Sequence, residues 1–539
     1  MIQKTILKLW TSAFGLGLIP IAPGTFGTLL AIPIYYFSKD AAGTGTDELI
    51  NAFHNKEGKM HPGLPIFKSI ATIFTIASGG SGGKEGPISQ VGAGIGVFVA
   101  NLVKSGARAR RTLMLAGTAA GLGAIFKAPL GGALTATEMV YKEDIESDAL
   151  IPCFIASVTA YIMYTAYAGP NPYMPVGEIS SLDLKELIFY IPLGLLCFLF
   201  GYLFIKGFNY SAVIIRRFKI HPILKPAIGG LIVGCISVLF YEISGNGSIF
   251  LEQTFTGNRP IYFGSQMQVI IASFLLIALL KIGATILTIS SGGSAGIFGP
   301  SLFIGGMLGA AVGTTAQLFL PELNIKISSF VVVGMGAFYA GVANAPIAGI
   351  LMVCEMTGSY ILLPPLIVVS IFTFILSKKI SFYKSQVKNR FHSPAHFWDM
   401  KFDVIESINI SDKFEGLRNL AVIKNTMLFK DIQQLATEIH ASDFVVTDKE
   451  DNYLGMIKLR AIDYSNQKLS SEILTVESFI DNTIPAIDYF QPLDKALNVI
   501  MQYDVDKVGV LKEGKINGYI RSRDIFNAYS EVVDSKRKN

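Results

Sequence analysis

Between residues 13 and 376 the chain is a succession of apolar segments that glycine and proline repeatedly interrupt. Several segments are shorter than the roughly 20 residues that an α-helix needs to cross a bilayer. Short, interrupted apolar helices are typical of transport proteins, in which half-spans end near the bilayer midplane and form a binding site there. The pattern predicts an α-helical polytopic membrane protein with broken helices. The segments are 13–37, 67–79, 87–103, 112–126, 128–141, 148–167, 185–206, 226–243, 267–289, 301–318, 328–341, 345–356 and 361–376.

The composition favours the same class of protein. Hydrophobic residues make up 51% of the 539 residues and charged residues only 16%, whereas about a quarter of the residues of soluble proteins are charged. The net charge of +5 is small and forms no basic stripe, so nucleic acid is not an expected partner. The cysteines stand singly and the histidines form no cluster, so we expect neither a disulfide framework nor a metal centre.

Two landmarks occur twice, in the same order and roughly 215 residues apart, which indicates an internal structural repeat. The first reads SGGSGGKEGP at Ser78–Pro87 and SGGSAGIFGP at Ser291–Pro300. The second is Ala128–Gly132 and Ala345–Gly349, each followed at the same distance by a Glu-Met pair. We therefore predict two structural halves with inverted repeats, as in many transporters.

After the last apolar segment the sequence changes character. Lys378 and Lys379 close that segment, and positive residues beside a span favour a cytoplasmic location for the remainder of the chain. Two β-hairpins are predicted, at 443–457 and 508–520, each with a polar turn. The predicted parts of the chain are an atypical apolar N-terminus (1–40), a membrane domain (41–392) and a soluble α/β tail built as a tandem repeat (393–539).

Glu85 is the residue with the clearest functional meaning. It lies in Gly83–Pro87, inside an apolar stretch, where a carboxylate is costly and is by default functional. Pro87 suits the first turn of a helix, and the free N–H groups of a helix start attract an anion without any full positive charge. A glutamate placed there competes with an anion as a tethered carboxylate. The alternative is that Glu85 only caps the helix.

Gly296–Pro300 has the same helix-start pattern but no ionisable side chain, so it offers only backbone amides, chiefly those of Ile297 and Phe298. Together these motifs closely resemble those of the CLC family of chloride channels and chloride/proton antiporters. Gly83–Pro87 is similar to that family's GK/REGP motif and Gly296–Pro300 to its GxFxP motif. Gly43–Asp47 stands where the family has GSGIP or a GxGxD variant.

The resemblance covers residues 41–390 and implies a homodimer in the lipid bilayer, in a bacterial-type plasma membrane, with a separate anion pathway through each subunit. Glu85 would be the external gating glutamate. The groups that would hold chloride are the hydroxyls of Thr44 and Tyr383 and the amides of Ile297 and Phe298. Holding the anion with dipoles makes physical sense, because a full countercharge would trap it.

Two departures from the family bear on the mechanism. Thr44 replaces the usual serine, which keeps the hydroxyl and adds a methyl group. Antiporters of the family often carry an internal glutamate directly after the position that Glu138 matches, and here that residue is Met139, which cannot relay protons. We therefore expect a voltage-gated-type chloride channel gated by Glu85. The alternative is a chloride/proton antiporter, in which Glu85 also carries protons.

The tail is similar to a pair of CBS modules, at 415–466 and 473–532. In such modules a Gly-hydrophobic-hydrophobic-x-x-x-Asp run ends on an aspartate that can bind the ribose of an adenine nucleotide. Gly518–Asp524 keeps this pattern, whereas the first module has Ala461 at the aspartate position. We expect a structural tail that stabilises the dimer, with adenine nucleotide binding at Asp524 as the alternative. No other cofactor is implied.

Residues 1–37 do not resemble the opening helices of a CLC protein, so the first half is expected to be incomplete. Gly15–Gly27 is similar to the start of bacterial phosphatidylglycerophosphatase A. A membrane lipid phosphatase remnant is thus a distant alternative, but the acidic cluster that phosphoryl chemistry with Mg²⁺ needs is missing after it. We expect no enzyme activity. A nucleotide sensor with a mere membrane anchor is disfavoured, because an anchor has no use for Glu85.

Overall fold

The computed structural model describes residues 39–177, 184–217, 219, 224–255, 257, 264–322, 325–396, 405–414, 416–462 and 474–538. The chain divides into two compact units, one that ends at Ala395 and one that begins at His396. The sequence placed this boundary at residue 393, close to the observed position. The atypical N-terminal segment and its resemblance to a phosphatase, at 1–37, lie outside the described residues.

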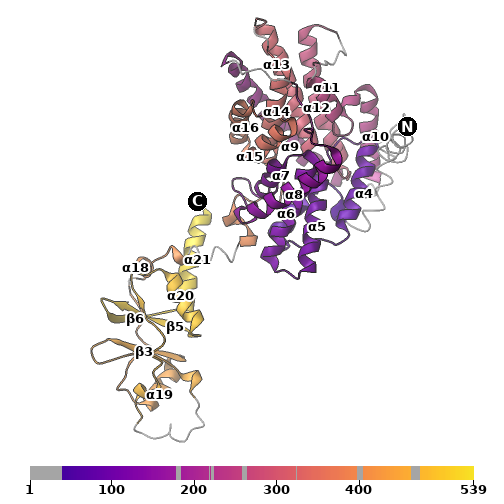
Figure 1. Ribbon diagram of the computed structural model, residues 1–539. Helices are drawn as coiled ribbons and strands as arrows, with labels where there is room; N and C mark the ends of the chain where they lie inside the picture. Colours follow the sequence, from indigo (N-terminus) through magenta and orange to yellow (C-terminus); the bar gives the residue numbers. More distant parts are fainter. Residues whose placement is uncertain are drawn as a thin grey trace. The chain divides into compact units, whose positions relative to one another are not determined.

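The first unit is a bundle of helices (Figure 1). Residues from both halves contribute to its large hydrophobic core. Each apolar segment from 67 onward forms a helix near its predicted bounds. The helices are α3 (Thr46–Asn55), α4 (Leu64–Ala77), α5 (Glu85–Leu102), α6 (Ala107–Phe126), α7 (Pro129–Glu138), α8 (Leu150–Ala168), α9 (Leu187–Arg217), α10 (Leu224–Leu239), α11 (Ser248–Phe255), α12 (Met267–Ser290), α13 (Phe298–Phe319), α14 (Ile327–Ala343), α15 (Pro346–Thr357) and α16 (Leu363–Ser377). Short 3₁₀ turns lie at Lys39–Ala41, Ser147–Ala149, Leu184–Glu186, Tyr241–Ile243, Arg390–His392 and Pro394–His396.

Four stretches of the described residues are long and apolar enough to cross a bilayer: α8 with the turn before it, most of α9, α12 and α13. Five further apolar helices, α4, α10, α14, α15 and α16, have only 10–17 residues. Proline in the first turn, where its missing N–H costs nothing, begins α4, α7, α15 and α16. The short, proline-started helices that the sequence predicts are therefore present.

The two halves of this unit repeat each other helix for helix. Helices α3–α8 have counterparts, in the same order, in α11–α16. Lys127 and Asn344, in the left-handed conformation with φ of 52° and 55°, end the equivalent helices α6 and α14. The second sequence landmark begins α7 in one half and α15 in the other.

Reciprocal contacts join the halves. The N–H of Gly83 donates to the carbonyl of Gly296 (2.7 Å), and the N–H of Gly296 donates to the carbonyl of Gly83 (2.6 Å). Contacts in which equivalent residues exchange roles are what a two-fold axis produces. The two halves are therefore related by a pseudo-two-fold axis that passes between these glycines.

Glu138 and Glu355 form a second reciprocal pair. Glu138 ends α7, and its carboxylate accepts the N–H groups of Ile347 (3.3 Å) and Ala348 (2.7 Å) in the first turn of α15. The carboxylate of Glu355, near the end of α15, accepts the N–H groups of the second and third residues of α7 (3.2 and 2.8 Å). Each half therefore satisfies helix-start N–H groups of the other.

Glycine allows the closest helix crossings. Gly92 of α5 faces the backbone of Gly117 in α6, and the equivalent Gly305 of α13 faces that of Gly334 in α14. A Cβ atom at any of these four positions would overlap the opposite backbone carbonyl. Small residues at such crossings let helices approach closely in membranes.

The second unit contains two copies of one small fold. Each copy has a three-stranded sheet in which a parallel pair is followed by an antiparallel hairpin. Both predicted hairpins are confirmed, as β2–β3 and β5–β6. The elements are α18 (Ile410–Lys413), β1 (Val422–Lys424), α19 (Phe429–Ile439), β2 (Asp443–Thr447), β3 (Tyr453–Lys458), β4 (Ile487–Asp488), α20 (Leu493–Gln502), β5 (Lys507–Lys512), β6 (Lys515–Arg521) and α21 (Ser522–Lys538), with 3₁₀ turns at Leu459–Ala461 and Val476–Phe479.

Candidate functional site

Glu85 is the first residue of α5 and its side chain is buried, with 2% exposed. Its carboxylate Oε2 accepts the N–H of Gly299 in the first turn of α13 (3.2 Å). A Cβ atom at Gly83 would overlap the same carboxylate, so the landmark glycine makes room for it. The side chain thus lies between the starts of two helices from opposite halves, where N–H groups favour an anion.

Ile297 directly precedes α13, and Phe298 is the first residue of that helix. Both are buried, with 1% and 5% of their surface exposed. Among the described residues, neither of their backbone N–H groups donates a hydrogen bond to a protein group. Buried N–H groups almost always have a partner. Two adjacent free donors beside a bound carboxylate are what an anion site requires. The prediction that these amides bind the anion stays a prediction, and the geometry is compatible with it.

Thr44 and Tyr383 are also buried, with 6% and 4% exposed. Thr44 precedes α3, and its carbonyl packs against Gly86 of α5. The hydroxyl of Tyr383 interacts with the side chain of Thr46, the first residue of α3. The carboxylate of the next residue, Asp47, accepts the N–H of Ser385 (2.9 Å) and so fixes the segment that carries the tyrosine. Thr46 was not among the predicted residues.

Two buried lysines support the loops around the site. Lys68 of α4 donates to two carbonyls in the loop before α3 (3.1 and 2.9 Å), and Lys281 of α12 donates to two carbonyls in the loop before α11 (2.9 and 2.8 Å). Both ammonium groups are fully buried. Both lysines could have been predicted from the repeat, because each precedes the SGGS sequence of its own half by the same number of residues.

Met139, at the position of the missing internal glutamate, is 2% exposed, and its carbonyl accepts the side-chain amide of Gln386 (2.9 Å). The neighbouring carboxylate of Glu138 is bound to the first turn of α15. An open cavity of about 470 Å³ reaches Glu138, and its lining includes Asn344 and Lys378. Water therefore has access close to Met139, although its side chain is buried.

The segment after Tyr383 pairs with the linker between α7 and α8. The N–H of Lys142 donates to the carbonyl of Val387 (3.0 Å), and the N–H of Glu143 donates to that of Lys388 (3.1 Å). Gln386 adds three side-chain bonds to carbonyls of both halves. The loop that carries Tyr383 is thus fastened to the first half of the repeat.

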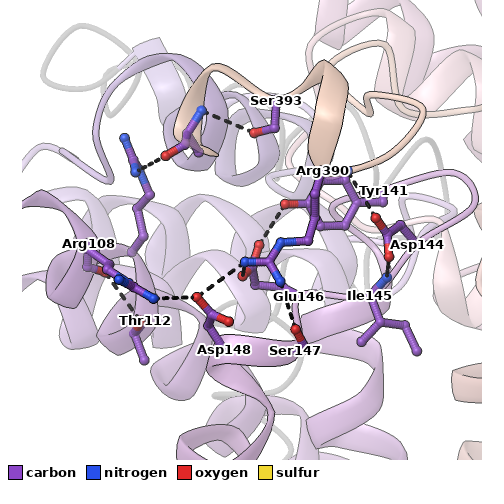
Figure 2. Close-up of polar contacts among 12 residues, drawn as sticks. Arg108, Thr112, Tyr141, Asp144, Ile145, Glu146, Ser147, Asp148, Arg390 and Ser393 are labelled. Carbon is purple, nitrogen blue, oxygen red and sulfur yellow. Dashed lines mark hydrogen bonds and ion pairs between the residues drawn. The ribbon is translucent and has the colours of Figure 1, made fainter. Parts of the chain in front are cut away.

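A polar cluster reinforces this attachment (Figure 2). The guanidinium of Arg390 contacts Asp148 (3.2 Å) and Glu146 (3.7 Å), and Arg108 of α6 pairs with the same Asp148 (2.8 Å). The hydroxyl of Tyr141 donates to Glu146 (2.6 Å). The Glu146 carboxylate is buried at 2% exposed, so Arg390 is a cation placed beside a buried negative charge.

Replacing Arg390 by glutamine is expected to lower the free energy of unfolding by about 3 kcal/mol, because removal of one partner leaves the other charge buried. Thermal unfolding of the purified protein in detergent measures this loss. The matched control is Arg108→Gln, since the Arg108 side chain is 72% exposed and an exposed pair contributes about 1 kcal/mol or less. Equal losses in the two variants would contradict the expectation.

Asp524 lies in the second unit, at the start of α21. Its carboxylate makes two bonds to the guanidinium of Arg521, both 3.0 Å. Burial raises the pKa of Asp524, but the bonds to Arg521 outweigh burial and the pKa lies below its usual value. The bonds to Arg521 use part of the capacity of this carboxylate to accept hydrogen bonds from a ribose. The described residues contain no cluster of histidine, cysteine or acidic side chains that could hold a metal ion.

Two interlocked helical repeats, with a buried carboxylate between two helix starts, define a membrane transport protein for an anion. A profile of the voltage gated chloride channel family matches residues 26–378. The chain belongs to this family, the CLC family, whose members are integral membrane proteins.

Two relatives and one solved structure illustrate the similarity. The chain is 30% identical over 364 residues to "H(+)/Cl(-) exchange transporter ClcA" of Citrobacter koseri, which covers 65% of this chain and 74% of that protein. It is 29% identical over 359 residues to "Putative chloride channel protein ClcB-like" of Ralstonia nicotianae, with 66% and 81% covered. The crystal structure of a CLC-type fluoride/proton antiporter has a TM-score of 0.60 and 25% identity, and covers 71% of this chain and 92% of its own.

Proposed function

We propose that this chain is a chloride/proton antiporter, in which Glu85 carries the proton. The observation that carries the proposal is the place of its carboxylate, bound to the N–H of Gly299 beside the free N–H groups of Ile297 and Phe298. A carboxylate in that position occupies a place suited to an anion. Because a charged carboxylate at membrane depth is costly, we expect the Glu85 side chain to leave this position in its protonated form. The passage of an anion is then linked to the uptake of a proton.

The sequence favoured a chloride channel, with exchange as the alternative, because Met139 cannot relay protons. The alternative now has better support, since relatives named as exchangers are among the most similar proteins. The open cavity that reaches Glu138 does not reach Glu85, so water in it would supply the first part of a proton route that avoids the Met139 side chain.

Chloride is the proposed anion and Thr44 the residue that tunes the preference. Its hydroxyl replaces that of a serine, and the threonine adds one methyl group to the side chain. The similarity to a fluoride/proton antiporter makes fluoride the first competitor to test.

We further propose a homodimer in a bacterial plasma membrane, with inverted halves and a cytoplasmic CBS pair as its tail. Exposed apolar side chains lie along one face of α8. They support the proposal that this face contacts lipid or a second subunit. The side chains are Ile151, Ile155, Val158 and Ile162. The bonds between Arg521 and Asp524 favour a structural tail over one that binds adenine nucleotide.

Proteoliposomes loaded with chloride test the proposed function. Chloride efflux and external pH are recorded in the same trace, with and without a proton carrier that collapses the pH difference. Exchange predicts that chloride efflux drives proton uptake against a gradient, and that fluoride at equal concentration is moved more slowly. Chloride efflux without proton movement would make the protein a channel.

A further inference from the structure

The geometry points to a second anion station, formed by Lys84, Tyr173, Asn246 and Ser248. The pseudo-two-fold axis relates it to the place that Thr44, Thr46 and Tyr383 form. The inference rests on the proposed function and deepens it, since it assigns a further binding place to the same anion.

The loop Gly245–Ser248 is built like the loop Gly43–Thr46. Each precedes a short helix, and each has carbonyls held by one of the two buried lysines. Each also accepts an N–H from the first landmark of the other half: Gly43 from Ala295 (3.3 Å) and Gly245 from Gly82 (3.0 Å). Asn246 is therefore the structural counterpart of Thr44, and Ser248 that of Thr46.

Tyr173 is the counterpart of the anion-site tyrosine, since each follows the last helix of its half, α8 or α16. The attachments of the two segments also correspond. The N–H of Met174 donates to the carbonyl of Met356 (2.8 Å), and the side chain of Gln386 donates to that of Met139 (2.9 Å). These two methionines are the ones that follow the repeated glutamates.

The members of the second station converge on the gating position. Tyr173, Asn246 and Ser248 line one small cavity together with Glu85 and Gly299. Asn246 and Ser248 also line an open cavity of about 470 Å³ that does not reach the glutamate. An anion that enters through the open cavity therefore meets the second station before it meets the gate.

The second station combines one half-buried ammonium, that of Lys84, with neutral hydrogen-bond donors. The ammonium of Lys84 lies 4.8 Å from the centre of the Tyr173 ring. A tyrosine hydroxyl carries one proton that it can donate to an anion.

Asn246 supplies the second donor. Its Oδ1 accepts the N–H (3.1 Å) and the hydroxyl (3.0 Å) of Ser248, which orients the amide. The NH₂ group of Asn246 donates to no protein group in the part of the chain that the structure describes. Amide and hydroxyl donors thus recur here in the combination expected at the first site.

Asn246→Asp tests the station, because an aspartate oxygen can still accept both bonds from Ser248 while the donor is replaced by a negative charge. We measure current against chloride concentration on each side of a planar bilayer. The expected result is a KM for chloride raised on the order of 10- to 100-fold on one side only, as for the loss of a hydrogen bond to a charged group. Tyr173→Phe is expected to raise the KM on the same side by about 10-fold.

Ser244→Asp is the matched control, since Ser244 lines the open cavity but not the small one. It introduces the same charge farther from the anion and is expected to raise the KM by about three-fold or less. An unchanged KM in Asn246→Asp, or an equal change in Ser244→Asp, would overturn the second station. A wild type that moves no anion would refute the proposed function but would not test the second station. In that case the purified wild type and variants are titrated with chloride in a calorimeter. The second station predicts weaker chloride binding in Asn246→Asp than in the wild type.

Discussion

Glu85→Gln is expected to abolish proton movement while anion flux continues. Glutamine has the size of a protonated glutamate but cannot ionise, so it can neither deliver a proton nor occupy the anion place with a charge. Loss of a general acid–base group costs on the order of 100-fold or more in rate, which brings proton flux to the leak of protein-free vesicles. Chloride efflux and external pH, recorded together in proteoliposomes, measure both quantities.

The control for Glu85→Gln is Glu252→Gln, which makes the same chemical change on the exposed side of α11. It is expected to keep the ratio of chloride to protons of the wild type. Proton uptake that persists in Glu85→Gln would show that another group carries the proton and would refute the proposed role of Glu85.

Gly309→Ala is expected to lower the free energy of unfolding of the first unit by about 3 kcal/mol, or to prevent its folding. Gly309 of α13 faces the backbone of Phe330 in α14, and a Cβ atom there would overlap the carbonyl oxygen of Phe330. Two packed helices would have to move apart along a crossing that the first half repeats between Gly96 and Leu113. Thermal unfolding in detergent and the yield of folded protein measure the effect.

Gly283→Ala is the matched control in the neighbouring helix α12. A Cβ atom at Gly283 meets nothing within 4 Å, and alanine is the better helix former by about 1 kcal/mol. This variant is expected to unfold at the temperature of the wild type or slightly above it. If both variants lost thermal stability to a similar extent, the close crossing of α13 and α14 would not explain why position 309 requires glycine.

The long and the short apolar helices could be predicted well from the sequence, because helices inside a bilayer have to be hydrophobic. The prediction missed α3 and α11, which are short and carry polar residues in their first turns, Thr46 and Asp47 in one and Ser248 in the other. Such helices are positioned by contacts from distant parts of the chain. Hydropathy alone does not reveal them.

The positions of Glu85, Ile297 and Phe298 at two helix starts could be predicted because glycine-rich helix starts have a recognisable sequence. Lys68 and Lys281 could not be predicted as easily, since they bind backbone carbonyls, which every residue offers. The relation between Thr44 and Asn246 was hidden for a different reason. The two side chains share no chemistry beyond hydrogen bonding, and only the repeated backbone makes them equivalent.

The exchange of helix caps between Glu138 and Glu355 has a consequence for biosynthesis. Helix α7 leaves the ribosome long before the residue whose carboxylate will accept its first N–H groups. At roughly 5–20 residues per second, the interval is on the order of tens of seconds. During that time the nascent first half carries unpaired polar backbone, which hydrocarbon does not tolerate. We therefore expect the start of α7 to reach its final position only after α15 has been synthesised, whereas α15 meets Glu138 already in place.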